Sequence, residues 1–144
     1  MVVGMDSLFV DTSGWIEVFG KNEPRHEEAL EIFSRALKVR RRIITTNYII
    51  SEYLGTDGKR CRLSRADLLS TVHRISNSPD IEVVHIGVKI HDVAITLLRN
   101  RLDKEWSLVD ATSFIVMEQR GIYEALTTDH HFEQARFIRL LTST

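Results

Sequence analysis

The chain has 144 residues, about the length of one domain. It carries 19 Lys and Arg against 20 Asp and Glu, so its formal net charge is −1, which does not by itself point to a polyanionic partner. Hydrophobic residues make up 43% and charged residues 27%, which excludes a disordered or low-complexity protein, and the single Cys61 excludes a disulfide framework and a multi-thiolate metal site.

Short apolar stretches alternate with amphipathic ones in the first half of the chain. The apolar run Ser7–Val10 predicts a strand, and Thr12–Phe19 begins with cap-type residues and predicts a helix. Residues 42–45 predict a second strand, and residues 47–53 predict a helix that Gly55 ends. Between these pairs, a further helix is predicted by apolar residues at one-face spacing: Ala29, Leu30, Phe33, Ala36 and Leu37.

The alternation continues in the second half of the chain. Helices are predicted over residues 64–77, 88–98 and 107–119, and strands over residues 81–86, 125–127 and 137–141. Strands separated by helices imply parallel pairing through right-handed crossovers. We therefore expect one α/β domain over residues 1–144, with three layers: a central, mostly parallel sheet of four to five strands and helices on both faces.

Four carboxylates lie at the ends of predicted strands or in the helices that follow them: Asp11, Glu52, Asp110 and Asp129. Open α/β sheets bind ligands outside the carboxyl ends of their strands, so we expect these side chains to meet at one rim. Each also has an ordinary local interpretation. Asp11 is a potential helix cap, Asp110 the acid of a capping box with Ser107, Asp129 the start of an Asx turn, and Glu52 part of a solvated helix face.

Carboxylates gathered at one site raise one another's pKa, so a positive partner is needed to keep them ionised. No Lys or Arg directly flanks any of the four acids in the sequence. A hard divalent cation is the expected counterion, and oxygen-only ligands favour Mg²⁺ or Mn²⁺ over zinc. Such an ion activates water and stabilises the charge of an in-line phosphoryl displacement.

Four segments of the chain resemble PIN-domain ribonucleases in order and spacing: FVDTSGWIEVF, TTNYIISEYL, KEWSLVDATSFIVMEQRGI and ALTTDHHFEQARFIRL. The sequence is most similar to the toxin components of VapBC toxin–antitoxin systems. The resemblance covers residues 8–140, and its most specific part is residues 106–121.

The resemblance implies a role for each of seven residues. Asp11, Glu52, Asp110 and Asp129 stand where the family keeps its metal-site acids, with Asp11 and Asp110 as the direct ligands. Thr12 and Ser13 would supply hydroxyls to the acids, and Ser107 would fix the helix start that aims Asp110. The family's Gly-Phe pair near the end is Arg136-Phe137 in this chain, which puts the conformation of that turn in question.

The resemblance also implies a function and partners. We expect a Mg²⁺- or Mn²⁺-dependent endoribonuclease that is paired with a small VapB-like antitoxin, whose C-terminal segment would lie in the acidic groove. We also expect a homodimer, with residues 23–54 as the candidate interface, and a hetero-oligomer with the antitoxin. The alternative is a catalytically silent PIN module that binds RNA or acts as a scaffold. A phosphotransfer enzyme of the haloacid-dehalogenase type would need a second Asp where Ser13 stands.

The near-zero net charge hides a strongly uneven distribution. Residues 1–34 carry a net charge of −5, residues 35–74 carry +7, and residues 75–144 carry −3. Within the basic block, five residues are predicted to contact RNA phosphates: Arg40, Arg41, Arg42, Lys59 and Arg60. The alternative for the first three is a solvated helix end, since cations suit a helix C-terminus.

The remaining signals concern the histidines and the compartment. No two of the six histidines lie four residues apart, so we expect no metal ligand among them, although His130 and His131 flank Asp129. The longest apolar run, residues 114–117, is far shorter than the ~20 residues that cross a bilayer. With no Lys or Arg before Lys21, a secretory signal is not expected either, so we expect a cytoplasmic protein.

Overall fold

The computed structural model describes residues 7–56 and 61–142. These residues form five strands: β1 (Ser7–Val10), β2 (Arg42–Thr46), β3 (Ile81–Val84), β4 (Glu124–Leu126) and β5 (Ile138–Arg139). They also form seven helices: α1 (Thr12–Phe19), α2 (His26–Lys38), α3 (Asn47–Leu54), α4 (Arg65–Asn77), α5 (Val88–Asn100), α6 (Leu108–Arg120) and α7 (His131–Gln134).

The strands pair in the order β3-β2-β1-β4-β5, and every pair is parallel. Phe9 of the central strand β1 lies opposite Ile44 of β2 on one side and Ala125 of β4 on the other. The inner strands are buried on both faces, as parallel sheets are, which explains why they are continuous apolar runs. The predicted three-layer α/β fold is confirmed, and its sheet is entirely parallel.

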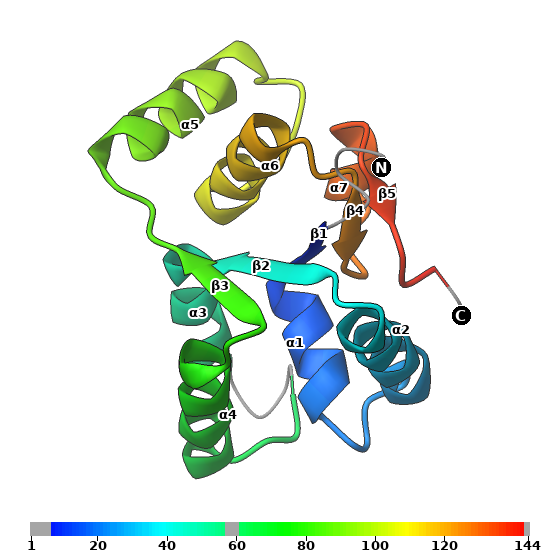
Figure 1. Ribbon diagram of the computed structural model, residues 1–144. Helices are drawn as coiled ribbons and strands as arrows, with labels where there is room; N and C mark the ends of the chain where they lie inside the picture. The colour runs from blue at the N-terminus through cyan, green and yellow to red at the C-terminus, as the bar shows by residue number, and fades with distance from the viewer. Residues whose placement is uncertain (1–6, 57–60, 143–144) are drawn as a thin grey trace.

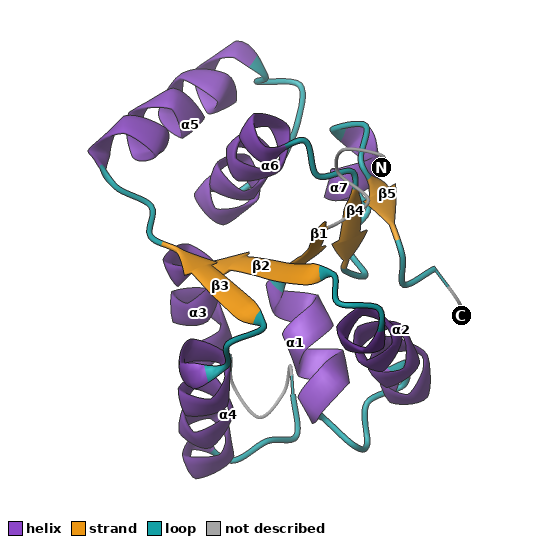
Figure 2. Ribbon diagram, viewed as in Figure 1, coloured by secondary structure: helices purple, strands orange, loops and turns teal. Residues whose placement is uncertain are grey.

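The helices cover both faces of the sheet: α1 to α4 lie on one side of it, and α5 and α6 lie on the other (Figures 1 and 2). The chain first moves outward from β1 to β2 and β3, then returns to add β4 and β5 on the other side of β1. Right-handed crossovers in opposite directions place their helices on opposite faces. The direction of the crossovers reverses between β1 and β4, so the carboxyl ends of these two strands border the crevice where such sheets bind ligands.

A close approach between α1 and β4 shapes this crevice. A Cβ added to Gly14 of α1 would lie 2.1 Å from the carbonyl oxygen of Leu126, the last residue of β4. Only glycine therefore allows the first turn of α1 to lie against the end of β4. Trp15, the next residue, is fully buried and donates from Nε1 to Thr45 Oγ1 of β2 over 3.1 Å. The two contacts fix the start of α1 against both neighbours of β1.

The observed elements differ from the predicted ones mainly at their ends, and α5 extends to Asn100 rather than to residue 98. β3 ends at Val84 rather than at residue 86, and β4 and β5 are shorter than predicted or shifted by one residue. The four-residue helix α7 was not predicted, because one turn is too short to show a helical period. No helix in the described part of the chain has the length and apolarity to span a membrane.

The turn after α7 is intact although Arg136 replaces the family's glycine. Arg136 takes a left-handed conformation, with φ at 73°. Its N–H donates to Glu133 O over 2.9 Å, and the N–H of Phe137 donates to Phe132 O over 2.9 Å. A glycine adopts this conformation without strain, whereas a side-chain-bearing residue pays about 1–2 kcal/mol. Arg136 therefore holds a strained conformation in a turn that these two hydrogen bonds close.

Candidate active site

The crevice between the ends of β1 and β4 is a cleft of about 480 Å³. All seven residues that the sequence analysis assigned to the site line it: Asp11, Thr12, Ser13, Glu52, Ser107, Asp110 and Asp129. They come from the ends of β1 and β4, from the starts or first turns of α1 and α6, and from the second turn of α3. All four carboxylates therefore line one cleft.

Asp11 is the most buried of the four acids, at 5% exposure. It occupies the N-cap position of α1, but its side chain makes no capping hydrogen bond, so the local interpretation of this residue is wrong. Its Oδ2 instead accepts from Thr127 Oγ1 over 2.9 Å. The pKa of Asp11 is raised to about 7, mainly by burial and to a smaller extent by the negative charges of Glu52 and Asp110, against the opposing hydrogen bond from Thr127.

Asp110 has a local role and a place in the cleft at once. Its backbone N–H donates to Ser107 Oγ over 3.0 Å, and its Oδ2 accepts from the Ser107 N–H over 3.0 Å. This capping box fixes the first turn of α6, where the helix dipole favours a negative charge. The same Oδ2 lies 2.9 Å from His131 Nδ1. The capping interpretation is confirmed, and the cap holds the carboxylate in the cleft.

Asp129 and Glu52 are held by neighbouring backbone and hydroxyl groups. Asp129 Oδ1 accepts from the N–H of His131 over 2.9 Å, which is the predicted Asx turn. Glu52 is half-buried rather than solvated, and its Oε1 accepts from Thr12 Oγ1. Thr12 thus ties the start of α1 to α3, and the predicted hydroxyl contact to an acid is present.

Thr127 joins the two strand ends and was missed by the sequence analysis. Its hydroxyl donates to Asp11 and accepts from the N–H of Asp129 over 3.0 Å. Ser13 Oγ lies 3.1 Å from Thr127 Oγ1 and accepts from the N–H of Thr128 over 2.9 Å. The one sequence signal for Thr127 was a polar residue at the end of an apolar strand. This signal does not identify Asp11, 116 residues away, as its partner.

His131 was also missed. Its Nδ1 lies 2.9 Å from Asp110 Oδ2 and 3.4 Å from Asp129 Oδ1, so the ring bridges two of the acids. Donor atoms of Asp129, His130 and His131 lie within 4.8 Å of one another, the one such group of three found among the described residues. The expectation that no histidine is a metal ligand rested on helical spacing, which gives no information on contacts between distant segments of the chain. Glu105 is a further acid that lines the cleft.

The residues of the cleft fit a divalent cation. Four carboxylates supply oxygen donors, and no Lys or Arg is found among the described residues that line the cleft. The burial of Asp11 beside two other acids favours its protonated form, and a bound cation would reverse this preference. Carboxylate oxygens are the donors that hard divalent cations bind in proteins.

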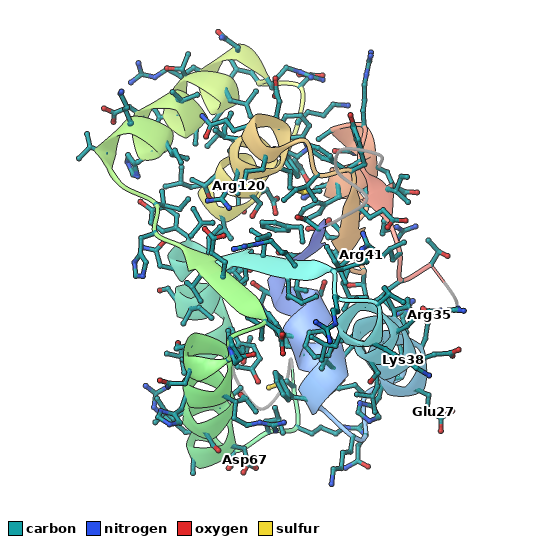
Figure 3. All side chains as sticks on the ribbon, viewed as in Figure 1. Glu27, Arg35, Lys38, Arg41, Asp67 and Arg120 are labelled. Carbon is teal, nitrogen blue, oxygen red and sulfur yellow. The ribbon has the colours of Figure 1, made fainter. Side chains whose placement is uncertain are left out.

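The three arginines of the basic block that the structure describes, Arg40, Arg41 and Arg42, do not line the acidic cleft. Arg40, Arg41 and Arg42 precede or begin β2, at the opposite edge of the sheet from the cleft. Arg41 pairs with Glu124 at 2.9 Å and lies near the C-terminal half of α2, with Arg35 and Lys38 (Figure 3). Arg42 pairs at 2.8 Å with Glu82, which also holds Arg120. Lys59 and Arg60 lie outside the described residues.

The fold and cleft define a class: three-layer α/β proteins with an acidic site at the carboxyl ends of a parallel sheet. The chain belongs to the PIN domain family, which it matches over residues 8–138. It is 30% identical over 133 residues to the 23S rRNA-specific endonuclease VapC20 of Mycobacterium tuberculosis, covering 92% of this chain and 97% of that protein.

Solved structures agree with this assignment. The crystal structure of M. tuberculosis VapC20, described as a Sarcin-Ricin loop cleaving toxin, matches with a TM-score of 0.79 at 27% identity, over 91% of this chain and 96% of that one. The crystal structure of FitAcB from Neisseria gonorrhoeae matches with a TM-score of 0.61 at 13% identity, over 94% of this chain and 96% of that one, and shares the fold. The resemblance inferred from the four sequence segments is confirmed.

Proposed function

We propose that the protein is a VapC-type endoribonuclease that cleaves RNA phosphodiesters with Mg²⁺ or Mn²⁺. The observation that carries the proposal is the burial of Asp11 at the β1/β4 crevice, in one cleft with Glu52, Asp110 and Asp129. Burial and the charges of Glu52 and Asp110 raise the pKa of Asp11 to about 7, so its ionised form is unfavourable without a cation. The relationship to VapC20, an RNA endonuclease, supports the reaction.

Asp11 and Asp110 would hold the cation directly, and Glu52 and Asp129 would complete the negative surface around it. When bound, the cation supplies a Lewis acid that polarises the phosphodiester and makes water a better nucleophile at neutral pH. Thr127 and Ser13 orient the carboxylate of Asp11.

Other groups in the cleft fix the remaining acids. Thr12 holds Glu52, and Ser107 fixes the turn that aims Asp110. His131 contacts Asp110 and Asp129 together, which sets the separation of these two carboxylates. A site whose acids are positioned before substrate binds needs little reorganisation during the reaction.

The test is cleavage of a synthetic hairpin of the sarcin–ricin loop, because the relative VapC20 is described as cleaving that loop. Purified protein should cut the hairpin with Mn²⁺ and not with EDTA, and Asp11→Asn should abolish the cut. Asp92→Asn, at an exposed position on α5, is the matched control and should cut normally. Binding of the hairpin without metal-dependent cleavage would instead establish the silent RNA-binding module.

We further propose a VapB-like antitoxin as partner. The cleft collects acids without a Lys or Arg among its described lining residues, so a cationic side chain from a partner segment would be attracted to it. Expression of the protein alone should arrest growth, and co-expression of the small protein encoded next to it should restore growth. Restored growth without a stable complex between the two proteins would contradict the proposal.

We also propose that two copies of this chain form a homodimer through residues 23–54. This segment exposes Leu30 at 41% and Val39 at 62%, which are apolar side chains on its outer surface. Light scattering of the purified protein should give twice the 16.6 kDa chain mass. Leu30→Glu should give the monomer, whereas Leu69→Glu on α4 should leave the mass unchanged.

A further inference from the structure

A second, smaller pocket is lined by residues of α5, α6, α7 and the segments that follow α5 and α7. These elements are labelled in Figure 1. Its volume of about 190 Å³ equals that of about six waters, the scale of a single heterocyclic base. Six of its lining residues are aromatic or polar: the aromatic Trp106, Phe114 and Phe137, and the polar Glu118, Gln134 and Arg136. None of the six belongs to the acidic site.

The aromatic residues form an apolar wall of the pocket, in which Trp106 and Phe114 are largely buried, at 8% and 4% exposure, and Phe137 is half-buried. The rings of Trp106 and Phe114 lie 5.1 Å apart at 78°, and those of Phe114 and Phe137 lie 5.7 Å apart at 32°. The guanidinium of Arg101 lies 5.1 Å from the centre of the Trp106 ring, and Asp103 holds it through two hydrogen bonds. Aromatic rings and a stacked guanidinium plane are surfaces on which unpaired RNA bases stack.

The pocket is close enough to the cleft to take a base from the same RNA strand. Asp110, Phe114 and Glu118 recur every four residues along one face of α6, so Glu118 lies about 12 Å along the axis from Asp110. Glu105 lines the cleft and the adjacent Trp106 lines the pocket. In α7, His131 faces the cleft and Gln134 borders the pocket.

The polar groups around the pocket present donors on one side and a carboxylate on the other. Trp106 Nε1 donates to Gln134 Oε1 over 2.9 Å, which fixes the orientation of the amide and leaves both of its N–H groups free to donate. Arg136 adds further donors, and its left-handed backbone, at φ 73°, is a strained conformation retained beside the pocket. Glu118 is exposed and adds an acceptor.

We propose that this pocket binds a guanine base of the RNA chain, one or two nucleotides from the cleavage site. Arg136 and the Gln134 amide donate to the O6 and N7 acceptors of guanine, and Glu118 accepts from its N1 and N2 hydrogens. Adenine offers a donor where guanine has O6, so it meets these donors unfavourably. The inference rests on the proposed ribonuclease function for its biological meaning, but base binding itself requires neither metal nor cleavage.

Fluorescence titration with guanosine monophosphate in EDTA tests the pocket directly. The chain has two tryptophans; Trp15 is fully buried, so a nucleotide in the pocket should quench Trp106 alone. We expect saturable quenching at concentrations up to about 10 mM, since a few hydrogen bonds give millimolar affinity. Adenosine monophosphate should bind about ten-fold more weakly, and inosine monophosphate, which lacks the N2 amino group, should lie between them.

Variants separate a specific pocket from general stacking. Glu118→Gln should weaken guanosine monophosphate binding about ten-fold and leave adenosine monophosphate unchanged. Arg136→Gly should weaken guanosine monophosphate while relieving backbone strain, so loss of folding cannot explain the result. Trp106→Phe should remove the signal, and Glu27→Gln, on the far side of the molecule on α2 (Figure 3), should change nothing.

Two outcomes would overturn the proposal: no saturable quenching by guanosine monophosphate, or equal binding of both purine nucleotides that Glu118→Gln does not alter. A protein that binds guanosine monophosphate but does not cut RNA would refute the ribonuclease and leave the pocket. If the protein cuts RNA, but replacing each guanine near the cut changes neither cleavage nor binding, only the proposed guanine pocket would be refuted.

Discussion

Thr127 donates its hydroxyl hydrogen to the carboxylate of Asp11 over 2.9 Å, and this contact joins the carboxyl end of β4 to that of β1. Both side chains are buried, at 0% and 5% exposure. The direction in which successive strands are added to the sheet reverses between these two parallel strands, so the hydrogen bond spans the crevice at its base. It also opposes the rise that burial imposes on the Asp11 pKa. The stability of the fold and the charge of the site therefore depend on the same carboxylate.

Asp11→Asn should stabilise the metal-free protein at alkaline pH while abolishing cleavage. The pKa of Asp11 rises from 3.8 to about 7 on folding, so its contribution to stability is full below pH 3.8 and is lost as the pH rises toward 7. At 1.36 kcal/mol per pKa unit, the loss is up to about 4 kcal/mol. Thermal unfolding in EDTA should show a higher melting temperature for the variant at about pH 8 and little difference at about pH 4. A variant less stable at both values would contradict the assignment.

Thr127→Val should shift the pH dependence of cleavage. Without the hydroxyl, the pKa of Asp11 rises further, so the acid limb of the pH–rate profile should move to higher pH. The loss of buried hydrogen bonds should also lower stability by about 1–3 kcal/mol. Thr112→Val is the matched control: Thr112 is equally buried, but its hydroxyl donates only to Val109 O over 2.9 Å. A profile that moves equally in both variants would argue against a role for Thr127 in orienting Asp11.

His131→Ala should make the protein more dependent on metal for stability. The imidazole contacts Asp110 and Asp129 at 2.9 and 3.4 Å, and its removal leaves these two acids to repel each other. We expect the metal-free variant to lose about 0.5–1.5 kcal/mol. Mn²⁺ should then raise its melting temperature more than that of the unaltered protein. His130→Ala removes a ring that is 65% exposed and 3.8 Å from Asp129, and should behave like the unaltered protein.

Gly14→Ala should damage both the fold and the site. The added methyl group would lie 2.1 Å from the backbone oxygen of Leu126, so α1 has to move away from β4. Overpacking of this kind costs about 1–3 kcal/mol, and the movement separates Asp11 from Thr127. Gly87→Ala, where nothing lies within 4 Å of the added methyl, is the control for alanine substitution itself. Equal melting temperatures and activities for the two variants would show that the close approach is unimportant.

Arg40→Glu tests the predicted RNA contact of the basic cluster. Arg40 is exposed and, unlike Arg41 and Arg42, forms no ion pair within the described residues. A phosphate contact at Arg40 predicts weaker RNA binding and a decrease of about one in the slope of log affinity against log salt. Arg99→Glu, an exposed change on α5, controls for overall charge. An unchanged slope would leave Arg40 as part of a solvated helix end.

Most of the fold was predictable because its information is local. The boundaries of Ser7–Val10 and Thr12–Phe19 were predicted correctly, since an apolar run and a cap-type start define them without reference to the rest of the chain. The capping box of Ser107 and Asp110 is likewise contained in four residues. α7 was not predicted, because a helix of a single turn is too short to show a hydrophobic period.

Partner identities were not predictable. Thr127 contacts Asp11 and His131 contacts Asp110, which lie 116 and 21 residues away, and no spacing rule reports contacts across such distances. The basic residues 40–42 precede or begin a strand, and the direction of the strand places them at the edge away from the acids. Charge counted along the chain could not reveal that separation.

By itself, the sequence determined the alternating strands and helices, the α/β class and the four carboxylates at the strand ends, because hydrophobic periodicity and capping act over a few residues. Tertiary structure decided the strand order, the crevice between β1 and β4, and the partners of each acid. These depend on packing between distant segments, such as Gly14 against Leu126. The burial that raises the pKa of Asp11 exists only once those segments have met.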